Sequence, residues 1–331
     1  MSSNYPDYID SPTTLPIPPG PYLFRNAQMA VFRLDADYEK LNALCKRYLN
    51  TPSERNFNYH PIPFSPSVFL IWIGMDYTSK SKPFGWIHED EVSFWVPTFA
   101  YNKEAILPIP QHIASFIPYL FLDDFYAIAL GREVYGFRKL QAQFVKMPQD
   151  ISKPEFNLNT VAFKTMNSNA VAQMEWLLSV EKVGDAPQPS STHWHNKQEA
   201  HNAIIHWLAE FYGSNVQQHE ELLRSIEREH TDLASFFEKL HLVWVFLKQF
   251  RDHITSTKAC YQAVIEALAM PTQFHSGGLI EGKYQFALNK LASLPIADQL
   301  GLSPTREVNG VQFFDLKNFF WLNFDFEVQG R

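Results

Sequence analysis

Residues 131–140 read Gly-Arg-Glu-Val-Tyr-Gly-Phe-Arg-Lys-Leu. The only lysine of this segment, Lys139, lies eight residues after Gly131. Apolar residues 113–130, whose pattern fits either helix or strand, precede the segment, and strand-like residues 156–164 and 173–180 follow it. The chain also contains 28 Phe, 8 Trp and 14 Tyr, enough to build a core and to line an apolar pocket. A lysine in such a pocket is a candidate nucleophile, because burial disfavours the charged ammonium.

The segment resembles the active-site segment of acetoacetate decarboxylases, which reads approximately Gly-Arg-Glu-x-x-Gly-x-Pro-Lys-Lys. Without gaps, Lys139 aligns with the first lysine, which in that family attacks a substrate carbonyl and forms a Schiff base. Arg138 stands in place of the proline. Leu140 stands in place of the second lysine, which lowers the pKa of the first in the family. A register with the proline deleted would align Arg138 with the nucleophile, but arginine is always protonated and cannot attack.

Three other regions resemble the same family in the right order. Residues 19–26 resemble its Gly-Pro-Tyr-x-Phe segment, and residues 91–97 resemble a strand that ends in Val-Pro and carries an active-site glutamate. Residues 243–266 and 282–302 resemble its C-terminal region, which includes a helix start at Leu294-Pro295-Ile296. We therefore interpret residues 1–331 as a single acetoacetate-decarboxylase-like domain, formed mainly by residues 15–182 and 242–328.

The resemblance implies an α+β fold, a large cone-like β-barrel with flanking helices, that holds the lysine in an apolar interior and assembles into homo-oligomers. Two segments depart from the family pattern. Residues 1–18 are polar and proline-rich, which is typical of an N-terminal arm. Residues 185–240 change to the 3.6-residue period of amphipathic helices, with a break at Gly213-Ser214-Asn215, and predict an inserted helical hairpin.

Composition narrows the possible partners and compartment. A formal charge of −7 argues against nucleic acid or an anionic membrane surface as the partner. The chain has no run of 18 apolar residues and no secretory signal at its start, so no membrane span is expected. Cys45 and Cys260 are far apart in sequence, which favours a reducing, cytoplasmic location.

Glu91 is the second candidate catalytic residue. It lies six residues before Pro97, as the family's active-site glutamate does, and Pro97 is expected to end the strand. A carboxylate there could position the substrate or exchange a proton with the reaction intermediates. Glu89 and Asp90 are close enough in sequence to take its place after a small shift of register, and a solvent-facing acid at a strand start is the alternative.

Three residues are assigned to substrate binding through the family alignment: Arg25, Leu70 and Leu140. The family's N-terminal arginine aligns with Ala27, and Arg25 would share its face on a regular strand, although a salt-bridged surface arginine fits as well. An acidic residue of the family aligns with Leu70. The site is therefore expected to be more apolar and less acidic than in a standard member.

Lys139 would then depend on burial or on another cation for its activation. The aromatic residues expected around it are Phe69, Trp72, Tyr135 and Phe137. An unburied lysine has only about one neutral amine in 2,500 at pH 7.

Arg132 and Glu133 are expected to pair and to brace the loop rather than to contact substrate. His193, His195, His201 and His206 include a His-x-His pair, but no carboxylate or cysteine is convincingly placed with them. We therefore predict no metal, and we predict no cofactor because a Schiff-base lysine itself supplies the electron sink.

The sequence favours a lyase that forms a Schiff base between Lys139 and a β-keto acid or related oxo acid, with decarboxylation, aldol or dehydration chemistry to follow. The aromatic content suggests a substrate larger and more hydrophobic than acetoacetate. The alternative is a non-catalytic protein that binds small molecules on the same fold.

Overall fold

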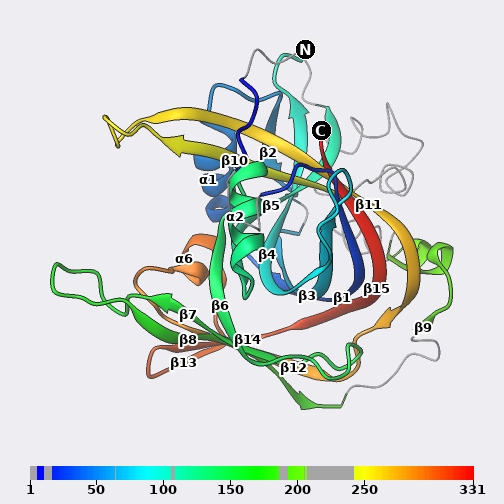
Figure 1. Ribbon diagram of the computed structural model, residues 1–331. Coiled ribbons are helices and arrows are strands. Elements are labelled where there is room, and N and C mark those ends of the chain that lie inside the picture. The colour runs from blue at the N-terminus through cyan, green and yellow to red at the C-terminus, as the bar shows by residue number, and fades with distance from the viewer. Residues whose placement is uncertain are drawn as a thin grey trace.

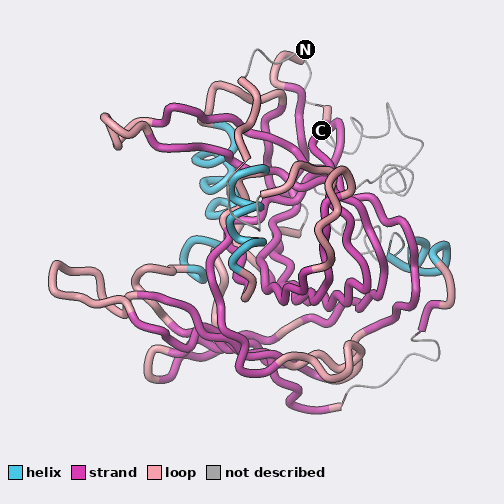
Figure 2. Tube along the Cα trace, in the orientation of Figure 1, coloured by secondary structure: helices cyan, strands magenta, loops and turns pink. Residues whose placement is uncertain are grey.

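The computed structural model describes residues 6–10, 17–63, 65–105, 109–185, 193–204, 206 and 242–331. Strands dominate these residues, and helices are few (Figure 2). The helices are α1 (Tyr38–Cys45), the π-helix η1 (Lys46–Asn50), α2 (Phe125–Val134) and α6 (Ile296–Leu300). The strands are β1 (Tyr22–Asp35), β2 (Phe57–Pro61), β3 (Ser67–Ser79), β4 (Ile87–Asn102), β5 (Pro110–Leu122), β6 (Lys139–Lys146), β7 (Phe156–Ala162), β8 (Gln173–Gly184), β9 (His193–Trp194), β10 (Leu242–Arg251), β11 (Ala259–Leu279), β12 (Lys283–Asn289), β13 (Arg306–Val308), β14 (Val311–Asp315) and β15 (Lys317–Gly330).

Seven strands pair in a closed ring. Its order is β4–β5–β10–β11–β15–β1–β3, and β3 returns to β4. All these pairings are antiparallel except β5–β10, which is parallel. Strand β6 leaves the ring from β5 and continues into a second curved layer in the order β6–β7–β8–β12–β14–β13 (Figure 1). The strand-rich α+β class predicted from the sequence is confirmed.

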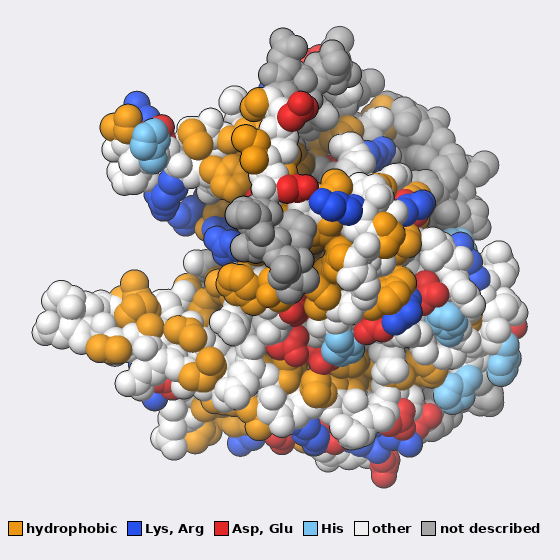
Figure 3. Space-filling model, viewed as in Figure 1, with side chains coloured by type: hydrophobic (Ala, Val, Ile, Leu, Met, Phe, Trp, Pro, Cys, Tyr) orange, Lys and Arg blue, Asp and Glu red, His pale blue; other side chains and the backbone are white. Residues whose placement is uncertain are grey.

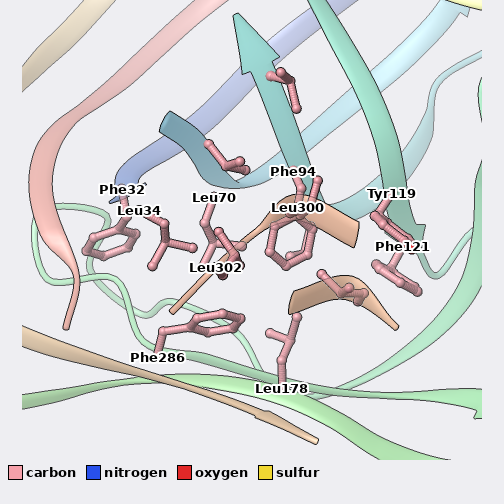
Figure 4. Close-up of a cluster of buried hydrophobic side chains, with 14 of the residues drawn as sticks. Phe32, Leu34, Leu70, Phe94, Tyr119, Phe121, Leu178, Phe286, Leu300 and Leu302 are labelled. Carbon is pink, nitrogen blue, oxygen red and sulfur yellow. The ribbon is translucent and has the colours of Figure 1, made fainter. Parts of the chain in front are cut away.

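The ring separates two hydrophobic cores, because successive side chains of a strand point to opposite faces. Ile71 and Ile73 of β3 point into the ring, where they join the inner core. Leu70 and Trp72 point outward, into an outer core between the ring and the second layer. Figure 4 shows this outer core, with Leu70 near Phe286 of the second layer.

Residues 113–139 form a strand, a helix and a turn that deliver Lys139 to the ring. The side chain of Asp124 caps α2 by accepting a hydrogen bond from the backbone N–H of Ala127. After α2, Gly136 has a φ of 76°, and an added Cβ would lie 2.6 Å from the Cα of Lys248. The turn therefore requires glycine, for both its conformation and its close approach to β10. Lys139 then begins β6 in register with Leu120 of β5.

The structure confirms the predicted start of one helix and corrects the predicted end of one strand. The helix expected after Leu294 is α6. Strand β4, however, continues through Pro97 to Asn102. Pro97 pairs with Ser115, and its carbonyl accepts a hydrogen bond from the N–H of Ile62 at 3.2 Å.

The predicted hairpin at 185–240 lies mostly outside the described residues, within which residues 197–204 are helical. The predicted arm, residues 1–18, is described only at residues 6–10 and 17–18. No helix in the described part of the chain is both long and apolar enough to cross a membrane. Cys45 is buried and Cys260 exposed, and both are free thiols.

Candidate active site

A cavity of about 50 Å³ lies inside the ring, and Lys139 is one of the residues that line it. Its walls come from β1, β3, β4, β5, β10 and β15, together with residues 130–139. The charged residues among its described lining are Lys139, Glu89 and Glu91. The remaining lining residues are mostly aromatic or aliphatic: Tyr22, Phe24, Met29, Ile73, Met75, Trp95, Ile117, Leu130, Gly131, Tyr135, Phe137, Leu242, Trp244, Phe324, Phe326 and Val328.

The lysine side chain fits beside α2 because position 131 has no side chain. A Cβ added to Gly131 would lie 2.8 Å from both Cδ and Cε of Lys139, closer than carbon atoms normally approach. On its other side, Nζ lies 5.3 Å from the centre of the Phe137 ring. Nη1 of Arg132 donates a hydrogen bond to the Lys139 carbonyl at 3.1 Å, which fixes the backbone at the start of β6.

Glu89 is the carboxylate nearest to the amine. Its Oε2 accepts a long hydrogen bond from Lys139 Nζ at 3.5 Å, and the residue is only 1% exposed. Burial raises the pKa of Glu89, while the positive charge of Lys139 opposes this rise. Glu89 is therefore well suited to accept a proton inside the cavity.

Glu91 lies on the same face of β4, two residues further along. Burial raises its pKa to about 7; the ammonium of Lys139 lowers it, the nearby Glu89 raises it, and a hydrogen bond with Ser93 lowers it. Ser93 Oγ in turn accepts a hydrogen bond from Nε1 of Trp95 at 2.8 Å. Glu91 can thus exist in either protonation state near neutral pH, and a short chain of hydrogen bonds fixes its position.

The indole N–H of Trp244 is another polar group at the cavity. Trp244 lines the cavity, and its Nε1 is buried without a hydrogen-bond partner among the described residues. Its ring lies edge-on to Trp95 at 5.7 Å and to Phe137 at 5.8 Å, measured between ring centres. Because a buried unpaired donor costs free energy, this N–H is a candidate partner for a ligand oxygen.

Of the four aromatic residues expected around Lys139, two line the cavity. Tyr135 and Phe137 do, as expected. Phe69 packs against the inner core but stacks on Phe319, with 5.8 Å between ring centres, and is not part of the cavity wall. Trp72 points into the outer core. The aromatic side chains leave a cavity of about 50 Å³ inside the ring, and the expectation of a larger substrate stays a prediction.

Arg25 is not brought to this cavity. A β-bulge between Phe24 and Ala27, with Asn26 at a φ of 52°, interrupts the alternation of β1. Ala27 consequently faces the inner core, while Arg25 is 43% exposed, pairs with Asp76 at 3.2 Å and stacks over Trp86. The surface ion pair considered as the alternative is what the structure contains.

Leu70 and Leu140 also lie away from the cavity. Leu70 is fully buried in the outer core, and Leu140 packs against the same core from β6. Leu140 follows Lys139 on a strand, so the two side chains point to opposite faces. Arg138 points away as well, with its guanidinium carbon 4.3 Å from the centre of the Tyr48 ring.

The remaining predicted residues have other partners. The ion pairs of the described residues do not include one between Arg132 and Glu133; Glu133 instead accepts a hydrogen bond from the hydroxyl of Tyr8. No group of three or more His, Cys, Asp or Glu side chains in the described ranges could hold a metal ion. His193, for example, lies edge-on to Trp321.

The sequence named Glu89 only as an alternative to Glu91, and it did not assign Gly131 a contact with the lysine. Glu89 and Glu91 are two residues apart, so a strand places both on one face. That spacing was the available signal for a pair of carboxylates. Gly131 becomes informative only when α2 is seen to lie against Lys139.

No family model matches this chain, and no curated protein matches it. Solved structures do. The acetoacetate decarboxylase of Legionella pneumophila superposes with a TM-score of 0.54 at 16% identity, over 100% of this chain and 92% of the other. A second acetoacetate decarboxylase structure gives a TM-score of 0.52 at 14% identity, over 98% of this chain and 95% of the other. Together with the ring of strands around a buried lysine, these similarities show that the chain has the acetoacetate-decarboxylase-like fold.

Proposed function

We propose that this protein is a carbon–carbon lyase that forms a Schiff base between Lys139 and the carbonyl group of a small β-keto acid or related oxo acid. The observation that carries the proposal is the position of the Lys139 amine, buried in a mostly apolar cavity 3.5 Å from a buried carboxylate. The fold supports the proposal, because two of the similar solved structures are acetoacetate decarboxylases.

Glu89 offers a route to a neutral amine without a second lysine. Lys139 and Glu89 are both buried, and a buried pair of opposite charges is costly to take out of water. Moving one proton from Nζ to Oε2 removes both charges at once and leaves a free amine beside a carboxylic acid. The raised pKa of Glu89 favours this transfer. In this proposal Glu89 replaces the activating lysine that Leu140 cannot supply.

The reaction that follows uses the side chains of Lys139, Glu89 and Glu91. Neutral Nζ attacks the carbonyl carbon, and the resulting hydroxyl leaves as water after it takes a proton from the Glu89 acid. The protonated imine accepts the electron pair of the breaking carbon–carbon bond, so that carbon dioxide leaves and an enamine remains. Glu91 has a pKa of about 7, so it can carry a proton near neutral pH, and it then gives this proton to the enamine carbon. Water finally hydrolyses the imine and regenerates the amine.

The apolar walls favour this loss of charge. The described lining contains no arginine, so the carboxylate of an oxo acid would have no guanidinium partner there. A carboxylate among apolar groups is destabilised relative to neutral carbon dioxide. The free N–H of Trp244 would hold one substrate oxygen, and the volume of about 50 Å³ favours a substrate of few heavy atoms.

Reductive trapping tests the proposal directly. The protein is incubated with acetoacetate, reduced with borohydride, digested and analysed by mass spectrometry. We expect an adduct on Lys139, none on Lys139→Ala, and none on Lys139→Arg, which keeps the positive charge. If the wild type binds acetoacetate in calorimetry but is never trapped, the protein is a non-catalytic binder and the proposal fails.

A further inference from the structure

A second, larger hollow lies behind the Lys139 segment. It has a volume of about 860 Å³ and is bordered by the β10–β11 hairpin, residues 136–140, β5, η1 and α6. The space-filling view shows a notch here, with Lys and Arg side chains along the wall formed by the hairpin (Figure 3). Phe137 lines both this groove and the Lys139 cavity, so it forms part of the wall between them.

Four cations line the groove: Arg132, Arg138, Arg251 and Lys258. No Asp or Glu is among its described lining residues, and none of the four forms an ion pair with a carboxylate in the described part of the chain. This is unexpected in a chain with 35 acidic and 28 basic residues. The side chains would repel one another less with an anion between them.

The arginines have neutral partners that leave donors free. Arg132 and Arg251 each donate to a backbone carbonyl, those of Lys139 and Ser256. Arg138 stacks over the face of Tyr48, a contact that uses the face of its guanidinium group and not the N–H donors at its edge. Arginine offers five donors in a planar fork that matches phosphate and carboxylate oxygens.

The rest of the groove fits an organic ligand and not a bare anion. Tyr48, Tyr119 and Phe250 supply aromatic surface, and Gln249, Gln262 and Gln299 supply amides. The volume falls within the range of about 300–1,000 Å³ that is common for small-molecule sites. The net charge of −7 repels a long polyanion such as nucleic acid more than a compact anion that lies within the groove.

We propose that this groove binds a phosphorylated small organic molecule. Its phosphate lies among Arg132, Arg138, Arg251 and Lys258, and its organic part lies against the aromatic side chains. The ligand would also lie against Phe137, which lines both the groove and the Lys139 cavity. The binding itself does not depend on the chemistry proposed for Lys139.

Calorimetry with two probes, inorganic pyrophosphate and ADP, tests this site. The variant Arg251→Ala/Lys258→Ala removes two exposed cations of the groove, and Lys290→Ala/Lys317→Ala removes the same charge elsewhere. We expect the Kd of pyrophosphate to rise at least about tenfold in the first variant, because hydrogen bonds to charged groups are lost, and to change little in the second. ADP is expected to bind more tightly than pyrophosphate, because the aromatic walls hold its base.

Three outcomes would overturn the proposal. Pyrophosphate and ADP could both fail to bind, or the two double variants could weaken binding equally, which would indicate a general charge effect. ADP could also bind no better than pyrophosphate, which would reject an organic ligand. Lys139→Ala is expected to bind both probes as the wild type does, so a failure of the Schiff-base proposal remains distinguishable from a failure of this one.

Discussion

Nζ of Lys139 and Oε2 of Glu89 lie 3.5 Å apart, and their side chains are 8% and 2% exposed. Such a buried pair is costly when both partners are charged, and its net worth to stability is small or negative. The two groups become inexpensive to bury when one proton moves between them. In the proposed function, Glu89 is the buried proton acceptor that activates Lys139, because the next residue is a leucine and not a second lysine.

Glu89→Gln is expected to reduce trapping of Lys139 at pH 7 by about 100-fold or more, because the amide cannot take the lysine proton. The rate of adduct formation with acetoacetate and borohydride measures the effect. Asp90→Asn is the matched control, since Asp90 lies next in sequence but faces His88 at 3.4 Å. Equal trapping rates in Glu89→Gln and wild type would exclude Glu89 as the proton acceptor.

Gly131→Ala is expected to slow trapping by about tenfold or more while changing stability little. The new Cβ would lie 2.8 Å from Cδ and Cε of Lys139 and force the lysine to move. Alanine favours helix over glycine by about 1 kcal/mol, which offsets part of the strain. Trapping rate and thermal unfolding are measured together, with Gly184→Ala as control, because a Cβ at Gly184 meets nothing within 4 Å. An unchanged trapping rate in Gly131→Ala would show that Lys139 does not need this space.

Trp244→Phe is expected to weaken acetoacetate binding by about tenfold, the worth of one hydrogen bond to a charged group. The substitution removes the unpaired Nε1 donor and keeps an aromatic ring. Calorimetry on the Lys139→Ala background isolates binding from reaction. Trp321→Phe removes another buried, unpaired indole N–H that lies in the outer core, and it should leave binding unchanged. Equal affinities for the two variants would rule out a substrate contact by Trp244.

The sequence predicted the strand-rich class, the helix after Leu294 and the approach of Lys139 to an apolar interior. It could not show which way some side chains point. Almost every residue of β3 is buried, because cores lie on both of its faces, so no alternation reveals that Ile73 faces the cavity and Leu70 the outer core.

Local backbone irregularities explain why the sequence did not predict the orientation of Arg25 or the length of β4. The positive φ of Asn26 creates the bulge that turns Arg25 to the surface, and asparagine adopts this conformation without a distinctive pattern around it. A proline usually marks the end of a strand, but β4 continues past Pro97. The Pro97 carbonyl accepts a hydrogen bond from the N–H of Ile62, in the segment after β2. Both depend on long-range pairing, which local sequence does not encode.

Glu91→Gln is expected to stabilise the protein at pH 8 but not at pH 4.5. Because the pKa of Glu91 rises from 4.5 to about 7 on folding, the folded state prefers the protonated acid. Stability contributed by this preference is complete below pH 4.5 and is lost as the pH rises towards 7. Glutamine mimics the protonated form and avoids the loss, which amounts to about 3 kcal/mol above pH 7. Urea unfolding at both pH values measures the difference, and Glu104→Gln, at an exposed position, is the control. A gain of equal size at both pH values would contradict the raised pKa.

Leu70→Ala and Ile73→Ala separate the outer core from the cavity. Both residues belong to β3, and both are at most 5% exposed. Each truncation is expected to cost about 2–5 kcal/mol of unfolding free energy, because it leaves a hole in a packed core.

Of the two residues, only Ile73 lines the Lys139 cavity, so only Ile73→Ala should enlarge the substrate site. Borohydride trapping with 3-oxo acids of increasing chain length measures the preference. In Ile73→Ala, we expect the trapping rate of a longer 3-oxo acid relative to acetoacetate to rise by about tenfold, which corresponds to burial of roughly one to two methylene groups. Leu70→Ala should keep the wild-type preference. A shifted preference in Leu70→Ala would place the substrate on the other face of β3, outside the ring.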